Sequence, residues 1–216
     1  MSYQNSNERL LAAQMAIENA LSDADIKAEL ALFGYDEARL LAGKALSEEA
    51  KSLSQTQLVE YGEQYAASND FYAKWEAAKT AYSRSLKVAR IAFKDNSKAQ
   101  SSLKLNGARK GSFYGWLNQA EDFYANLLAN PDLTAVLAGY GYDEAKLQTE
   151  AALVATADAA NNLQQTEIGE AQDATKARDA KLDELDDWVN DFRGIAEVAL
   201  ADRPQLLEKL AFGPMP

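Results

Sequence analysis

The stretch Phe33-Gly34-Tyr35-Asp36-Glu37-Ala38-Arg39-Leu40 recurs as Tyr140-Gly141-Tyr142-Asp143-Glu144-Ala145-Lys146-Leu147, which lies 107 positions further along the chain. The same shift, without a gap, pairs residues 60–63 with residues 167–170 and gives 28 identities in total. A repeat of this length constrains the architecture, because each copy forms the same structural unit. The sequence therefore predicts two homologous halves, 1–107 and 108–216, that pack with pseudo-two-fold symmetry.

The repeated stretch carries the signals that end one helix and begin another. Gly34 and Gly141 allow the left-handed backbone that commonly ends a helix, at no steric cost. Two residues later, Asp36 and Asp143 are of a type that caps a helix by accepting hydrogen bonds from its first N–H groups. We therefore expect a short helix before each glycine and a long helix after each aspartate.

The composition is typical of an all-α protein. Alanine and leucine dominate the hydrophobic residues, and the chain has only four prolines, which favours helices. Apolar residues recur at a spacing of three to four from Leu40 to Phe93 and from Leu147 to Leu200, as on one face of a helix. We predict an all-α fold built by tandem duplication of an up-and-down helical bundle unit.

The middle of each long helical pattern leaves two architectures open. Unbroken, each pattern would form a helix of about 60 residues and about 90 Å, at 1.5 Å per residue. Gly62, Gly169 and the sequence Ser68-Asn69-Asp70 have the chemistry of turns. We therefore expect a helical hairpin that turns within 62–70 and 169–177. The alternative is two very long helices that join helical ends in a dumbbell.

Missing residue types and net charge exclude several classes of function. The chain has no histidine and no cysteine, which excludes Ser-His-Asp and Cys-His catalysis and the usual zinc sites. The net charge of −11 disfavours binding to nucleic acid or to anionic membranes. The polar start, residues 1–8, lacks the order of a signal peptide. We expect a cytoplasmic, non-enzymatic protein without a cofactor.

The repeated Glu-x-Gly-Glu motif is the first candidate site. It places Glu60 and Glu63 in the first half and Glu167 and Glu170 in the second half. Glutamates three residues apart share a helix face, and clusters of carboxylate oxygens suit Mg²⁺, Ca²⁺ or Mn²⁺. We treat all four as candidate ligands of a divalent metal. The alternative interpretation is that they are solvated glutamates beside a glycine.

Opposite charges on homologous segments are the second candidate site. Arg84, Lys87 and Arg90 lie close to one helical stripe, whereas the corresponding helix of the second half is acidic over residues 179–191. The basic residues either bind an anionic partner or steer the two halves together, as charged flanks do in coiled coils. We therefore expect a protein partner or self-association, and a role in protein–protein interaction or structure.

Aromatic residues of the first half form a third set. They suit a pocket between helices, but a role in the core or at an interface is the commoner use of such a stripe. The second half does not repeat them. The set is Tyr61, Tyr65, Phe71, Tyr72, Trp75 and Tyr82.

Three motifs carry a resemblance to a known group of proteins: the stretch 34–40 with its second copy 141–147, the Glu-x-Gly-Glu centre at 60–63, and the segment 87–94. With these motifs the chain resembles a group of duplicated helical bacterial proteins of uncharacterised activity. The resemblance covers most of the chain and implies a duplicated helical bundle. It carries over no activity, cofactor or binding residue.

Overall fold

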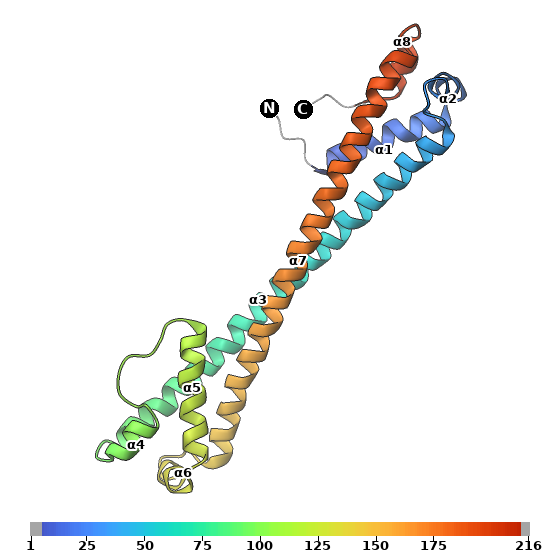
Figure 1. Cartoon of the computed structure of the whole chain (residues 1–216). Helices are drawn as coiled ribbons and strands as arrows, with labels where there is room; N and C mark the ends of the chain where they lie inside the picture. The colour runs from blue at the N-terminus through green and yellow to red at the C-terminus, as the bar shows by residue number, and fades with distance from the viewer. Residues whose placement is uncertain (1–5, 213–216) are drawn as a thin grey trace. The chain divides into compact units, whose positions relative to one another are not determined.

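A computed structural model describes residues 6–212, which form eight α-helices and no strand (Figure 1). The prediction of an all-α protein is confirmed. Within these residues, no helix has both the length and the apolar character that crossing a membrane requires. The helices are α1 (Ser6–Ser22), α2 (Ala24–Ala31), α3 (Glu37–Ala92), α4 (Ser97–Ser102), α5 (Phe113–Leu128), α6 (Pro131–Ala138), α7 (Glu144–Ala199) and α8 (Pro204–Lys209).

The sequence repeat extends to the boundaries of the helices. The bounds of α2, α3 and α4 each recur 107 residues later in α6, α7 and α8. Gly34 and Gly141 both adopt a left-handed backbone, with φ of +81° and +78°. Asp36 accepts a hydrogen bond of 2.9 Å from the third N–H beyond it, and Asp143 does the same. The predicted glycine stops and aspartate caps are therefore confirmed.

The predicted hairpins within 62–70 and 169–177 are wrong, because α3 and α7 each continue for 56 residues through those segments. Neither helix contains a proline, and an interior glycine costs only about 1 kcal/mol relative to alanine. The residues that were expected to form the turns instead make contacts on the helix surface. Ser68 accepts a hydrogen bond from Gln164, and Asp70 pairs with Lys74 one turn later.

The chain divides into two compact units, and each unit contains parts of both repeats. Unit 1 comprises residues 1–62 and 169–216, and unit 2 comprises residues 63–168. The divisions fall at the central glycines, Gly62 and Gly169, of the two long helices. The boundary between compact units therefore differs from the boundary between the repeats. Unit 1 holds α1, α2, the first part of α3, the last part of α7 and α8; unit 2 holds the rest.

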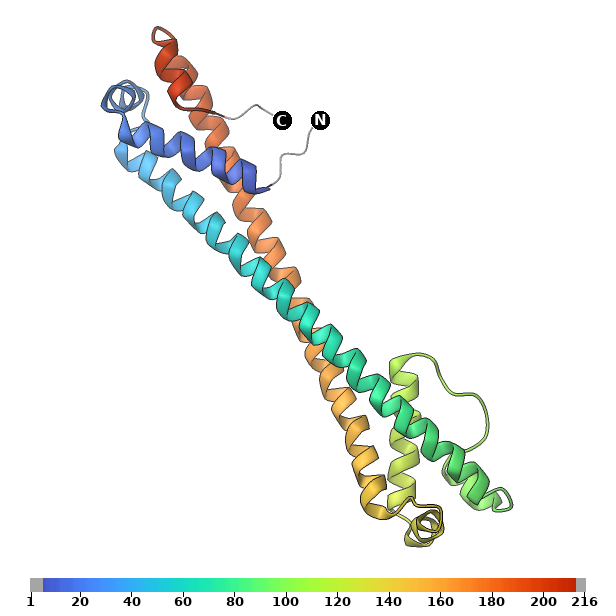
Figure 2. The ribbon, with the colours of Figure 1, turned by 180° about the vertical axis from the view of Figure 1, so that it is seen from behind.

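The core of unit 1 contains residues from both the first and the last part of the chain. Tyr35, at the start of α3, packs its ring against Trp188 and Phe192 of α7, with centroids 5.7 and 5.4 Å apart. The long-helix segments run antiparallel, since Gly43 faces Trp188 and Glu49 pairs with Lys181. Both views show α1 and α2 beside these segments (Figures 1 and 2). The buried residues of this cluster are Ala16, Ala20, Ile26, Leu30, Tyr35, Leu40, Phe192, Ala196, Leu200, Leu206 and Leu210. A second buried cluster of the unit comprises Leu10, Ala13, Ala50, Leu182 and Leu185.

The core of unit 2 is rich in aromatic residues. Phe113 and Trp116 of α5 pack against Phe71 and Trp75 of α3, with ring centroids between 5.0 and 6.1 Å apart. The two views show α5 beside both the last part of α3 and the first part of α7 (Figures 1 and 2). The core is therefore centred on α5, which both long helices cover.

Candidate functional site

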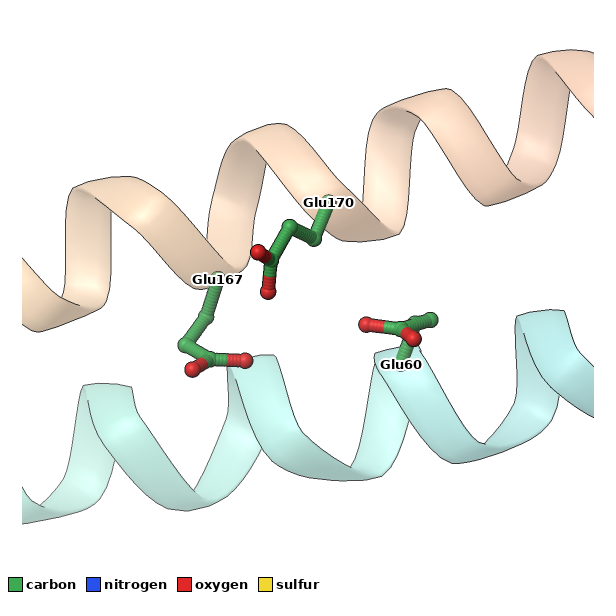
Figure 3. Close-up of side chains that lie close together, drawn as sticks. All are labelled: Glu60, Glu167 and Glu170. Carbon is green, nitrogen blue, oxygen red and sulfur yellow. The ribbon is translucent and has the colours of Figure 1, made fainter.

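The Glu-x-Gly-Glu motifs lie on continuous helix rather than at turns, with Glu60 and Glu167 half-buried and Glu63 and Glu170 exposed. Figure 3 shows Glu60 on α3 and Glu170 on α7 pointing toward each other within unit 1. Carboxylate oxygens of these two residues lie within 4.8 Å of each other. Of the four predicted glutamates, the structure therefore brings two together within unit 1. Glu63 and Glu167 belong to unit 2.

The predicted basic residues belong to unit 2, whereas the acidic segment 179–191 belongs to unit 1. Arg84 and Lys87 are exposed on α3. Arg90 instead holds the chain after α4, since its Nε donates to the carbonyl of Leu105 at 2.7 Å. With 11 basic and 12 acidic residues, unit 2 has a net charge of −1, whereas unit 1, with 11 and 21, has −10.

Three acidic residues of segment 179–191 pair with basic residues of unit 1. Asp186 pairs with Arg9 of α1, and Asp179 pairs with the adjacent Arg178. Lys181 pairs with both Glu49 and Glu184, and both carboxylates raise the pKa of its amine. These pairs stabilise contacts inside unit 1, between α1, α3 and α7.

The aromatic set predicted on α3 divides between two helix faces. Phe71 and Tyr82 are buried in the core of unit 2, which fits the core interpretation. Tyr61, Tyr65 and Tyr72 are exposed, with exposed fractions between 58% and 68%. In unit 2, Tyr114 of α5 is exposed as well as Tyr65 and Tyr72. We call the three the tyrosine surface: Tyr65, Tyr72 and Tyr114.

Contacts with the core fix two members of the tyrosine surface. The ring of Tyr72 lies 5.0 Å from that of Phe71, and the ring of Tyr114 lies 5.4 Å from that of Phe113. Phe71 and Phe113 are themselves in edge contact at 5.0 Å. The hydroxyl of Tyr114 accepts a hydrogen bond of 3.0 Å from the side chain of Asn161 on α7. α3, α5 and α7 therefore all contribute to the position of this surface.

A buried polar cluster in unit 2 escaped prediction from sequence. Glu150 of α7 is only 9% exposed, and it accepts hydrogen bonds from the hydroxyls of Ser85 and Tyr124. Burial, with the nearby Glu150 carboxylate, raises the pKa of Tyr124 well above its usual range. The three residues come from three helices that are distant in sequence, so no local motif reveals them. All three residues are buried in the core of unit 2.

A polar cavity of about 580 Å³ lies beside α4 in unit 2. We call it the loop cavity. The side chain of Arg109 is fixed at its edge, because it donates to the hydroxyl of Tyr82 and to the carbonyls of Lys104 and Asn106, each at 2.9 Å. The described residues that line the cavity include two cations and no carboxylate. They are Ser97, Gln100, Ser101, Lys104, Asn106, Arg109 and Gln119.

Unit 1 has a smaller cavity, of about 180 Å³, at the homologous position beside α8. Its lining residues Leu207, Glu208 and Ala211 are the counterparts, 107 residues later, of three residues that line the loop cavity. Phe212 also lines it, with the guanidinium of Arg193 5.4 Å from the centre of its ring. The duplication therefore placed a hollow at the same point of both repeats, with different chemistry in each.

Comparison of the chain with protein-family models, curated proteins and solved structures yields no match.

Proposed function

We propose that the chain is a non-catalytic protein-interaction module that binds a protein partner through the tyrosine surface of unit 2. The observation that carries this proposal is the exposure of Tyr72 (58%) and Tyr114 (59%) around one aromatic cluster. Tyr65, which is 68% exposed, lies seven residues before Tyr72 on the same helix, about two turns away. Tyrosine is enriched at protein interfaces, because its ring gives a large contact area and its hydroxyl a hydrogen bond.

The tyrosine surface is also preorganised. Contacts with Phe71 and Phe113, and the hydrogen bond from Asn161, restrain Tyr72 and Tyr114 before any partner arrives. Binding to side chains that are already ordered loses less conformational entropy, so more of the contact energy appears as affinity. Grouped exposed aromatic residues are a feature of interaction sites, whereas isolated ones are ordinary on any surface.

The experiment compares two tagged double variants with the wild type in cells of the source organism. One variant carries Tyr72→Ser and Tyr114→Ser. The control carries Tyr140→Ser and Tyr61→Ser, which remove exposed tyrosines outside the tyrosine surface. After chemical crosslinking, we expect a defined protein to be recovered with the wild type and the control but not with the first variant. Equal recovery with all three proteins would contradict the proposal.

The second candidate function is binding of a divalent cation by Glu60 and Glu170, which the short separation of their carboxylates favours. Oxygen ligands of this kind suit Ca²⁺ and Mg²⁺. Calorimetric titration with each ion tests it, with Glu60→Gln as the variant and Glu63→Gln as the matched control. Saturable binding that only Glu60→Gln removes supports the cation, and heat equal to that of dilution contradicts it.

A further inference from the structure

We propose that the loop cavity of unit 2 binds a small organic anion that carries carboxylate or phosphate groups. This goes beyond the proposed protein interaction, because the loop cavity and the tyrosine surface share no residue. The volume of about 580 Å³ lies in the range of small-molecule sites, which is roughly 300–1,000 Å³. A molecule the size of a metabolite, rather than a single inorganic ion, therefore fits the space.

The lining has the chemistry that an anion requires. Lys104 and Arg109 supply positive charge, and the other five lining residues are all serine, asparagine or glutamine. Ser97 and Ser101 are four residues apart on α4, so their hydroxyls lie on the same helix face. Hydroxyl and amide groups donate hydrogen bonds to carboxylate and phosphate oxygens. The amide of Gln100 already donates to the carbonyls of Phe93 and Lys94, and that of Asn106 donates to Gln100. The serine hydroxyls and the ammonium of Lys104 are therefore the groups that would donate to an anion.

The homologous cavity of unit 1 shows that the fold does not need this chemistry. Lys104 and its counterpart Ala211 both adopt a left-handed backbone, with φ of 48° and 51°. The lysine is therefore not required by the turn that follows the helix. Ser101 corresponds to Glu208, so the serine position of unit 2 is a carboxylate in unit 1. Both differences make the cavity of unit 2 more favourable to an anion than its duplicate.

The surrounding chain adds a positive field. The segment 84–110 has eight basic residues and one acidic residue, although the whole protein has a net charge of −11. Such a local concentration of charge raises the concentration of anions near a cavity. Lys104 pairs with Asp122, but both side chains are about half-exposed, and pairs of this kind contribute little stability. An anion in the cavity is thus able to compete with Asp122 for the lysine.

Arg109 gives the site a fixed charge. Its Nη atoms are held by the hydroxyl of Tyr82 and by the carbonyls of Lys104 and Asn106. The guanidinium is therefore ordered before a ligand arrives, so binding loses little of its side-chain entropy. Because Arg109 organises the segment after α4, its replacement would disturb the cavity itself, and Lys104 is the better residue to test.

The experiment titrates full-length protein with glycerol 3-phosphate and, separately, with citrate, by calorimetry at low ionic strength. The variant is Lys104→Ala. The control is Lys98→Ala, which removes the same charge from the same region but does not line the cavity. We expect one anion per chain to bind, with an affinity that falls about tenfold in Lys104→Ala, or about 1.4 kcal/mol, and hardly changes in Lys98→Ala. A preference between the two probes identifies phosphate or carboxylate as the recognised group.

Two results would overturn the proposal. One is that neither probe binds saturably at millimolar concentration. The other is an equal loss of affinity in Lys104→Ala and Lys98→Ala, which would mean that the anion responds to the general field of segment 84–110. The double variant Ser97→Ala/Ser101→Ala provides a second measurement that keeps every charge, and unchanged affinity in it would also contradict a built site. Thermal melting of each variant confirms that it is folded.

Discussion

The indole ring of Trp188 occupies the space that a side chain at position 43 would fill. A Cβ atom built on Gly43 would lie only 2.4 Å from the ring, far inside van der Waals contact. The ring also packs against two aromatic neighbours, because its centroid lies 5.7 Å from that of Tyr35 and 5.2 Å from that of Phe192. Gly43 is therefore required by the packing of α3 on α7 in unit 1, although glycine weakens a helix.

Gly43→Ala tests this relationship. Alanine favours the helix by about 1 kcal/mol over glycine, but overpacking of a core costs about 1–3 kcal/mol. Because Trp188 cannot move without losing its contacts with Tyr35 and Phe192, we expect the second effect to win and unit 1 to lose stability. Urea unfolding measures the loss, and hydrogen exchange should localise it to unit 1. In a Trp188→Phe background the same change should cost less, and an equal cost in both backgrounds would contradict the contact.

Replacing the central glycines, Gly62 and Gly169, by alanine should raise the stability of the protein. A Cβ atom on Gly62 or Gly169 would meet no heavy atom within 4 Å, and neither residue has a positive φ. Gly62→Ala and Gly169→Ala should therefore each stabilise the protein by about 0.5–1 kcal/mol through helix propensity alone. The measurement is the midpoint of urea unfolding followed by circular dichroism. A loss of stability would show that the long helix bends at the glycine.

The contrast between Gly43 and Gly62 explains which parts of the fold were predictable. Gly34 and Asp36 act through bonds to residues a few positions away, so local sequence was sufficient to place the helix ends. Whether α3 turns at Gly62 depends on competition between local cost and distant packing. The segment after Gly62 packs on α5 and on α7, through contacts such as that between Ser68 and Gln164. Local sequence does not contain that information.

The buried polar cluster of unit 2 escaped prediction for a related reason. The glutamates of the repeated motif were visible because Glu60 and Glu167 are identical under the shift. Glu150 was not, since its counterpart is Gly43, and its hydrogen-bond partner Ser85 corresponds to Phe192. The same position of the fold is filled by a carboxylate and hydroxyls in unit 2 and by an indole ring in unit 1. Comparison of the repeats reveals only the residues that both repeats share. Glu150 and Ser85 differ from their counterparts in the first and second repeats, so the comparison does not reveal them.

Ser85→Ala should destabilise unit 2 although it removes only one oxygen atom. Glu150 is buried and accepts hydrogen bonds from Ser85 and Tyr124, so the variant leaves the carboxylate with one of two donors. A buried polar group that loses its partner typically costs about 1–3 kcal/mol. Thermal or urea unfolding measures the effect. The double variant Ser85→Ala/Glu150→Leu, which removes the carboxylate as well, should recover much of the loss, and failure to recover it would argue against the hydrogen bond.

Tyr124 should make unit 2 sensitive to alkali. Burial raises the pKa of its hydroxyl in the folded state, and the Glu150 carboxylate adds to the rise. The folded state therefore holds this proton more tightly than the unfolded state, whose tyrosines titrate near pH 10. The stabilisation is complete below that pH and declines as the pH rises above it, because only the unfolded chain releases the proton readily. We expect the free energy of unfolding to fall above about pH 10, as measured by urea titrations over a pH series.

The Tyr124→Phe variant separates this residue from the other tyrosines. It should be less stable than the wild type at neutral pH, because Glu150 loses a donor, and its stability should fall less steeply above about pH 10. Tyr140→Phe is the matched control, since Tyr140 is 53% exposed in the same unit. The control should keep the alkaline slope of the wild type. If Tyr124→Phe keeps that slope as well, the alkaline loss has another origin, and the protonated hydroxyl at Glu150 does not stabilise unit 2.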